Sequence, residues 1–175
     1  SGSVDRVVAS GVDEFSQVLL RAFADRHLID PRCMGKSGSG TSAKRTLIPG
    51  ESGTTLVIER LSSARARNHP PLAVLADAAT MGSGTRAHQF TAPAAAAETV
   101  HSWLGERSID LLVSSGACGP ARQDVDQAIC EAVGNPVLMD LGTSVGQSPS
   151  GGVLAVAIGA LACAAGRIPG DPKTT

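Results

Sequence analysis

Apolar and polar positions divide the chain into short apolar runs that alternate with stretches of helical spacing. Runs rich in β-branched residues and leucine, bounded by Gly, Pro or charged residues, predict strands. Apolar residues that recur every four positions predict helices. The expected strands are Val7–Ala9, Thr54–Glu59, Leu72–Ala79, Ile109–Ser114 and Pro136–Asp140, and the expected helices are Val12–His27, Leu61–Asn68, Ala94–Arg107, Asp124–Val133 and Gly151–Ala165.

Boundary residues refine these elements. Gly11 is expected to end the first strand, Thr91 and Pro93 to begin the helix that follows them, and Gly166 with Pro169 to end the last helix. Alternating strands and helices predict an α/β fold around a largely parallel sheet. No linker divides the chain into independent domains.

The last expected helix belongs to an uncharged run from Gly151 to Gly166. A membrane span needs about 20 predominantly apolar residues. This run is shorter than that and is rich in Gly and Ala, so we expect a buried helix and no membrane span.

Composition narrows the classes of function. The 175 residues include 15 Lys+Arg and 16 Asp+Glu, a net charge of −1, and 42% are hydrophobic, which excludes a disordered tail. The near-neutral charge gives no indication of nucleic acid or an anionic membrane. Aromatic residues are only 2% of the chain, which argues against stacking surfaces for single-stranded nucleic acid or sugars.

The four cysteines indicate no metal or disulfide chemistry. Cys33, Cys118, Cys130 and Cys163 are widely separated and form no C-x-x-C pair. Free thiols in a reducing cytosol are the expectation, and no secretory signal is visible. We therefore expect a cytoplasmic protein without metal or cofactor.

Two glycine-containing motifs indicate enzyme chemistry but lack necessary parts. Gly35-Lys36-Ser37 resembles the end of a phosphate-binding loop, yet Asp30 stands where that loop requires its first glycine. Ser144, within Gly142–Gly146, matches the G-x-S-x-G turn of serine hydrolases. The hydrolase order requires a histidine downstream, whereas the four histidines all precede Ser144: His27, His69, His88 and His101. A small α/β serine hydrolase remains an alternative on Ser144.

Two further features are weak candidates. Cys118 follows an expected strand and is an alternative nucleophile. Its sequence neighbourhood has no histidine, which favours a small residue in a glycine turn. Arg60, Arg65 and Arg67 are candidates for a phosphorylated partner, but a solvated helix face explains them equally simply.

Four segments resemble, in order and spacing, motifs of the β-ketoacyl synthase family. Asp5–Glu14 is similar to the family's D-x-x-L-A-G-G-x-E stretch, and Ile109–Pro120 to its I-D-x-V-x-A-H-G-T-x-T-P loop. Pro49–Arg67 is similar to a family segment with a G-E-G-x turn, a strand ending in Glu and a helix with A-R-A-R-G. Gly146–Pro169 is similar to the family's G-H-x-x-G-A-A-G loop and the helix after it. The resemblance implies a thiolase-like fold, layered α/β/α/β/α. The resemblance also implies that residues 4–169 are the later part of a domain that is incomplete at both ends, and that residues 170–175 are a tail.

The departures from the motifs fall on the family's catalytic positions. The two histidines that bind the thioester carbonyl in the family are matched by Ser115 and Gln147, and the family lysine by Gly142. Ser and Gln neither take up a proton near neutral pH nor offer a cationic donor to a developing enolate. The resemblance therefore implies that the chain has no intact catalytic residues and does not condense substrates alone.

Loss of these groups resembles the chain-length-factor branch of the family. That branch implies a subunit of a type II polyketide or fatty-acid synthase that pairs with an active ketosynthase, as a hetero- or homodimer, and works with an acyl carrier protein. An alternative is part of an active β-ketoacyl synthase completed by another chain, with Ser115 and Gln147 as tolerated substitutes.

Overall fold

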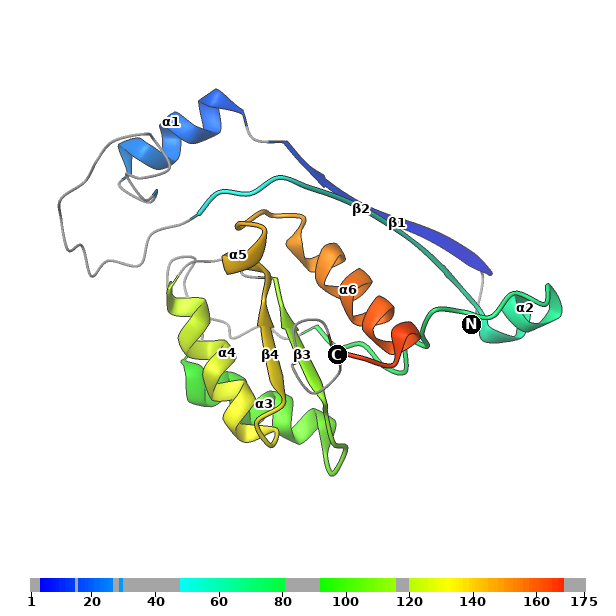
Figure 1. Cartoon of the computed structure of the whole chain (residues 1–175). Coiled ribbons are helices and arrows are strands. Elements are labelled where there is room, and N and C mark those ends of the chain that lie inside the picture. The colour runs from blue at the N-terminus through cyan, green and yellow to red at the C-terminus, as the bar shows by residue number, and fades with distance from the viewer. Residues whose placement is uncertain are drawn as a thin grey trace.

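The computed structural model describes residues 4–14, 16–26, 29, 48–80, 92–115 and 120–168. Their helices and strands form a mixed α/β structure in which the last helix lies between two strand pairs (Figure 1). In chain order the elements are β1 Arg6–Asp13, α1 Gln17–Asp25, β2 Ser52–Glu59, α2 Leu61–Ala66, α3 Pro93–Leu104, β3 Leu111–Ser114, α4 Pro120–Ala132, β4 Val137–Asp140, α5 Leu141–Ser144 and α6 Gly151–Ala165.

Strands β1 and β2 form an antiparallel ribbon in which Arg6 pairs with Glu59. The predicted end of the first strand at Gly11 is wrong, because β1 continues to Asp13. A Cβ at position 11 would lie only 3.0 Å from Ser150 Cβ. Glycine at this position therefore lets the ribbon approach α6 closely instead of breaking the strand.

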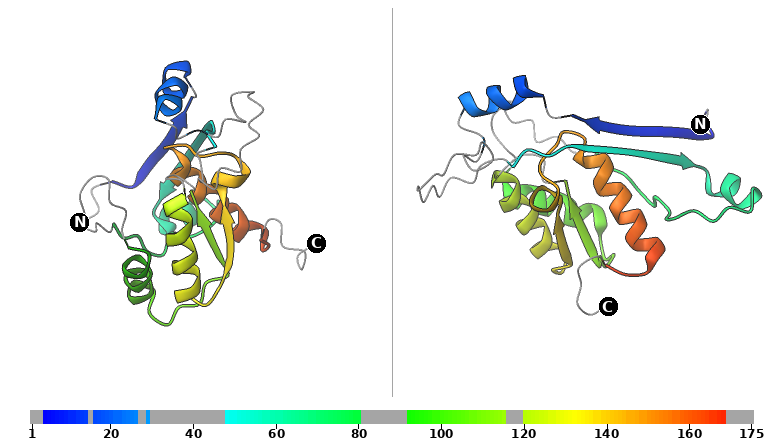
Figure 2. Two further views of the ribbon diagram at one scale, coloured as in Figure 1. Left: turned by 90° about the vertical axis from the view of Figure 1, so that its left-hand side faces the viewer. Right: turned by 45° about the horizontal axis from the view of Figure 1, so that its top comes forward.

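Strands β3 and β4 form a parallel pair with Leu111 opposite Val137 and Ser114 opposite Asp140. The predicted parallel sheet is thus correct for this pair, whereas the ribbon is antiparallel. Helices α3 and α4 lie on one side of β3–β4, and α6 lies on the other side with the ribbon beyond it (Figures 1 and 2). The resulting order of layers is helices, parallel pair, α6 and ribbon.

The helices follow the expected positions with shifted starts. Helix α1 begins at Gln17 rather than Val12, because Ser16 caps it by accepting a hydrogen bond from the Leu19 amide. Pro93 opens α3 as predicted, while Thr91, the predicted cap, lies outside the described residues. Gly166 ends α6 in the left-handed conformation, with φ of 61°.

The predicted strand Leu72–Ala79 is wrong. The structure has no strand within residues 70–80, and Leu72, Val74 and Leu75 are exposed there. A strand exists only where a neighbouring strand takes up its backbone hydrogen bonds. Local β-propensity cannot supply that neighbour.

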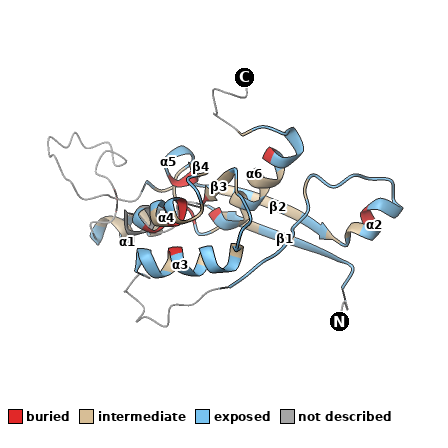
Figure 3. Cartoon of the chain, turned by 90° about the horizontal axis from the view of Figure 1, so that it is seen from below, coloured by how far each residue is buried: buried red, intermediate tan, exposed pale blue. Residues whose placement is uncertain are grey.

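The core surrounds the parallel pair (Figure 3). Val125, Ile129 and Cys130 of α4 and Leu141 of α5 are buried. The spacing of apolar residues predicted that Val125, Ile129 and Val133 share one face; the first two are buried, whereas Val133 follows the end of α4 and is half-buried. Every residue of β1 and β2 is exposed or intermediate. The expectation that α6 is a buried helix is wrong, because only Gly151 and Ala162 of its 15 residues are buried, and Val156 and Leu161 are exposed. No helix in the described ranges combines the length and apolar character needed to cross a bilayer.

Candidate functional site

Three predicted site residues lie near the carboxyl ends of β3 and β4. Ser115 follows β3 directly, Gly142 lies in α5 directly after β4, and Gln147 lies between α5 and α6. Because the two strands are parallel, their carboxyl ends share one edge of the sheet. Ligands of α/β proteins commonly bind outside such an edge, so we treat it as the candidate site.

Ser115 is half-buried and lies against the first residue of α6. A Cβ added to Gly151 would lie 2.9 Å from the carbonyl oxygen of Ser115 and 3.3 Å from its Cβ. Glycine at position 151 therefore permits the end of β3 to contact the start of α6. This contact places Ser115 beside the loop that carries Gln147.

Ser144 has a local structural role in α5. Its Oγ donates to the Asp140 carbonyl at 3.3 Å, and the Asp140 carboxylate accepts from the Gly142 amide at 2.8 Å. Within the described part of the chain, Ser144 makes no hydrogen bond to a histidine, and His101 lies on α3. Ser144 thus follows a strand, as the hydrolase motif expects, without the base that the motif needs. Gly142 itself is buried.

Several predicted residues lie outside the described residues. They are Cys118, the loop residues Gly35–Ser37, and the histidines His27 and His88.

Two loops cross in backbone contact beside α5; we call residues 48–52 and 146–150 together the seam. Gln147 N donates to the Ile48 carbonyl at 2.6 Å, and Gly50 N donates to the Gln147 carbonyl at 3.0 Å. A Cβ on Gly50 would overlap the Val145 carbonyl oxygen and lie 2.7 Å from Gly146 Cα. The seam therefore has no room for a side chain at position 50.

Gln147 has a buried side-chain oxygen at the seam. Its backbone is fixed by both hydrogen bonds of the crossing, and the side chain's Oε1 is buried with no hydrogen-bond partner among the described residues. A neutral amide can donate and accept hydrogen bonds but does not titrate near neutral pH. Position 147 can therefore bind a polar group but cannot act there as a general acid or base.

Three serines that were not among the predicted site residues connect the same loops. Oγ atoms of Ser52, Ser148 and Ser150 lie 2.9 Å (52 to 148), 2.6 Å (52 to 150) and 2.8 Å (148 to 150) apart. Ser148 is buried, and the Ser150 amide donates to the Asp13 carboxylate at 3.4 Å. We call these three residues the serine cluster. It joins both strands of the ribbon to the start of α6.

A buried carboxylate behind the site was also missed. The Ser114 hydroxyl, at the end of β3, donates to the Asp126 carboxylate on α4, and both residues are buried. In the sequence, the only indication of this carboxylate is that Asp126 directly follows Val125, a residue of the apolar face of α4. Cys130 lies one turn further along α4, and burial, with the charges of Asp126 and Glu131, raises the pKa of its thiol. Cys130 is therefore a neutral core residue rather than a nucleophile.

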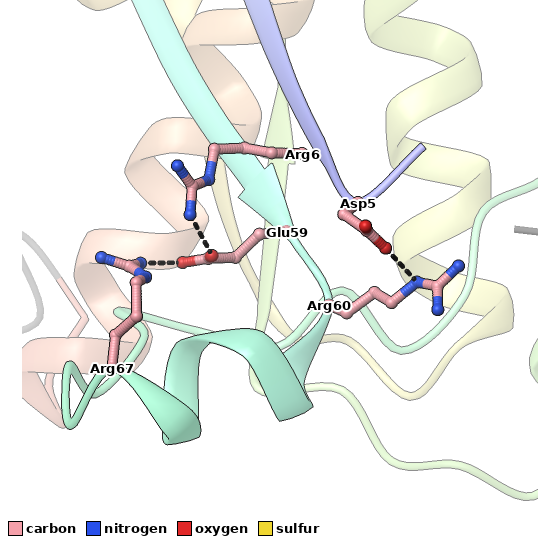
Figure 4. Close-up of polar contacts among 5 residues, drawn as sticks. All are labelled: Asp5, Arg6, Glu59, Arg60 and Arg67. Carbon is pink, nitrogen blue, oxygen red and sulfur yellow. Dashed lines mark hydrogen bonds and ion pairs between the residues drawn. The ribbon is translucent and has the colours of Figure 1, made fainter. Parts of the chain in front are cut away.

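The arginines near α2 form ion pairs at the far end of the ribbon (Figure 4). Arg6 and Arg67 both contact the Glu59 carboxylate, and Arg60 contacts Asp5 at 3.2 Å. The guanidinium of Arg67, and less strongly that of Arg6, holds the pKa of Glu59 below its ordinary value. These contacts give Arg60 and Arg67 a structural role.

A shallow pocket lies away from the candidate site. It lies where α3 and α4 end, and His101, Leu104, Arg107 and Val133 are among its lining residues. The strands β3 and β4 begin near this end of the helices, so the pocket and the carboxyl edge are at opposite ends of the parallel pair.

In the described ranges no three His, Cys, Asp or Glu residues are grouped to hold a metal ion.

Comparisons with known proteins give one structural likeness. No family model matches the sequence, and no curated protein matches it. Among solved structures, the chain is similar to one titled "The ishigamide ketosynthase/chain length factor", with a TM-score of 0.65 and 20% sequence identity. The match covers 99% of this chain and 46% of the solved chain. The chain therefore shares the fold of part of that protein and spans less than half of its length.

Proposed function

We propose that this chain is a ketosynthase-like subunit with a thiolase-like fold that does not condense acyl groups itself. In this proposal it pairs with an active ketosynthase, of a type II polyketide or fatty-acid system, and shapes the elongation of a chain delivered by an acyl carrier protein. Residues 4–169 are then the later part of the ketosynthase-like domain.

The observation that carries the proposal is the placement of Ser115 and Gln147. The motif resemblance puts them at the family's two histidine positions, and both lie close to the start of α6 at the carboxyl edge of β3–β4. A decarboxylative condensation develops negative charge on a thioester enolate, which hydrogen-bond donors stabilise, most strongly when they carry positive charge. A serine hydroxyl and a neutral amide carry no positive charge and take up no proton near neutral pH, which supports binding rather than catalysis at this edge.

Exposed apolar side chains support a partner surface. On the face of the ribbon that points away from α6, Val8, Val12 and Val57 are 64%, 77% and 63% exposed. Apolar patches of this kind mark interaction surfaces when they are contiguous. Val8 and Val57 are direct cross-strand partners, and the Ser10–Thr55 pair lies between them and Val12 on the same face.

Reconstitution tests the proposal. A ketosynthase with an intact Cys-His-His set, encoded beside this chain, is assayed with acyl carrier protein in the presence and absence of the chain. We expect the two proteins to co-elute in size-exclusion chromatography and the product length to change only in the pair. The chain alone should give no carrier-protein-dependent condensation.

Three outcomes would decide against the proposal. Robust turnover by the chain alone would show an active enzyme. Turnover restored by a fragment that supplies only a missing nucleophile would favour the alternative, an active synthase completed by another chain. Labelling of Ser144 by a fluorophosphonate probe, abolished in Ser144→Ala, would favour a serine hydrolase.

A further inference from the structure

The serine cluster coincides with two departures from the family motifs. In the G-E-G-x motif the third residue is glycine, and this chain has Ser52 there. In the G-H-x-x-G-A-A-G motif the fifth residue is glycine, and this chain has Ser150 there. These two serines are 98 positions apart in sequence, yet their hydroxyl oxygens lie 2.6 Å apart.

The hydrogen bonds of the cluster close on themselves. Three hydroxyls carry three protons, and the three Oγ–Oγ contacts of 2.6 to 2.9 Å need three donors. If each hydroxyl donates to one neighbour and accepts from the other, all three contacts are satisfied. The three hydroxyls therefore satisfy one another without a bound ligand, and they connect the loops that carry them.

The serine cluster attaches the loop that carries Gln147. Ser148 follows Gln147 directly in the chain, Ser150 lies three positions after it, and Ser52 begins β2. The backbone hydrogen bonds of Gln147 to Ile48 and Gly50 fix the same loop from its other side. Between these two attachments, the half-buried side chain of Gln147 has little freedom to move its buried Oε1.

We propose that Ser52, Ser148 and Ser150 form a hydroxyl clamp that holds the loop of residues 146–150 against β2 and thereby positions the Gln147 amide. The three serines are positioning residues, since they act through Gln147. The clamp rests on the proposed function only for the role of Gln147 at the carboxyl edge of β3–β4. Its test needs no ketosynthase and no activity, so the two proposals fail independently.

Amide hydrogen exchange and NMR of the full chain test the clamp. Ser52→Ala and Ser150→Ala each remove two of the three hydroxyl contacts at residues that are only partly buried, so folding should survive. We expect amides 146–151, apart from Pro149, which has no amide hydrogen, to exchange about five- to tenfold faster, the change that loss of one or two hydrogen bonds produces. The side-chain amide signals of Gln147 should shift in both variants.

Matched variants separate the clamp from general loosening of the ribbon. Ser10→Ala also removes one hydroxyl partner, from the Ser10–Thr55 pair at 2.8 Å on the outward face of the ribbon. It should leave amides 146–151 and the Gln147 signals unchanged. Ser52→Thr keeps the hydroxyl, so its amide exchange should stay at the wild-type rate. In the double variant Ser52→Ala/Ser150→Ala the same amides should exchange only a little faster than in either single variant, because each substitution already removes the contact that the two serines share.

Two results would overturn the clamp. One is unchanged exchange and unchanged Gln147 signals in both alanine variants. The other is an equal acceleration in Ser10→Ala, because the loop would then respond to the ribbon as a whole.

Discussion

The parallel pair β3–β4 and the antiparallel ribbon β1–β2 both contact α6, yet they are held in place by different interactions. Around the parallel pair, Ser114, Val125 and Leu141 are buried, and α3 and α4 add a second helical layer. The ribbon has longer strands, but none of its residues is buried. Strand length and hydrogen bonding therefore do not decide which pair forms the core; coverage of both faces does.

The ribbon depends instead on a few contacts at its two ends. At one end the seam and the serine cluster attach it to the start of α6. At the other end Glu59 binds Arg6 and Arg67. The parallel pair therefore depends on buried side chains spread over several elements, whereas the ribbon depends on single sites at its two ends.

The largest effect is expected for Gly50→Ala at the seam. The added Cβ would meet backbone atoms of Val145 and Gly146, which cannot rotate away as a side chain could. We expect a loss of about 3 kcal/mol or more in the free energy of unfolding, the upper range for overpacking. Urea denaturation followed by circular dichroism measures it.

Gly152→Ala is the matched control for that substitution. It adds the same methyl group in α6, where nothing lies within 4 Å of the new Cβ. Alanine replaces glycine in a helix there, so stability should rise by up to about 1 kcal/mol. If Gly50→Ala changed stability by less than about 1 kcal/mol, the close crossing at the seam would be wrong.

A pair of chemically identical substitutions compares the two regions directly. Val125→Ala removes two methyl groups from the buried face of α4, and Val57→Ala removes them from the outward face of the ribbon. We expect Val125→Ala to cost about 2 kcal/mol and Val57→Ala to stay within about 0.5 kcal/mol in urea denaturation. Equal losses would show that the outward face of the ribbon is covered in solution.

The sequence predicted elements best where one chain segment determines its own structure. Periodicity located α3 and α4, because each exposes one side and packs the other, whereas the uncharged apolar run located α6. It failed at Gly11, where glycine serves a close contact with α6, and at Leu72–Ala79, where no neighbouring strand is present. Both errors depend on distant parts of the fold.

The candidate site shows the same limit. Ser115, Gly142 and Gln147 were identified by motif resemblance, and the parallel register of β3–β4 places the segments that carry them at one edge. Ser52 and Ser150 stand at glycine positions of the motifs, but their contact with each other and with Ser148 could not be predicted, because it forms only through the tertiary fold. Polar contacts between distant loops are invisible to local patterns.

The smallest effect is expected at the charged end of the ribbon, as pH is lowered. The pKa of Glu59 is held below its ordinary value, first by Arg67 and then by Arg6. A carboxyl group with a lowered folded pKa stabilises the fold at pH values above its unfolded pKa. This contribution is lost as the pH falls through the folded pKa. The melting temperature of the wild type should therefore exceed that of Glu59→Gln at pH 7, and the difference should vanish in acid.

Arginine variants locate the source of that pH dependence. Arg67→Gln should remove more of it than Arg6→Gln, because Arg67 is the larger cause of the lowered pKa. Arg65→Gln, on the same helix as the Arg67 cap, should leave it intact, since Arg65 makes no ion pair with Glu59 in the described part of the chain. A pH-independent difference between wild type and Glu59→Gln would mean that Glu59 holds the ribbon end by packing.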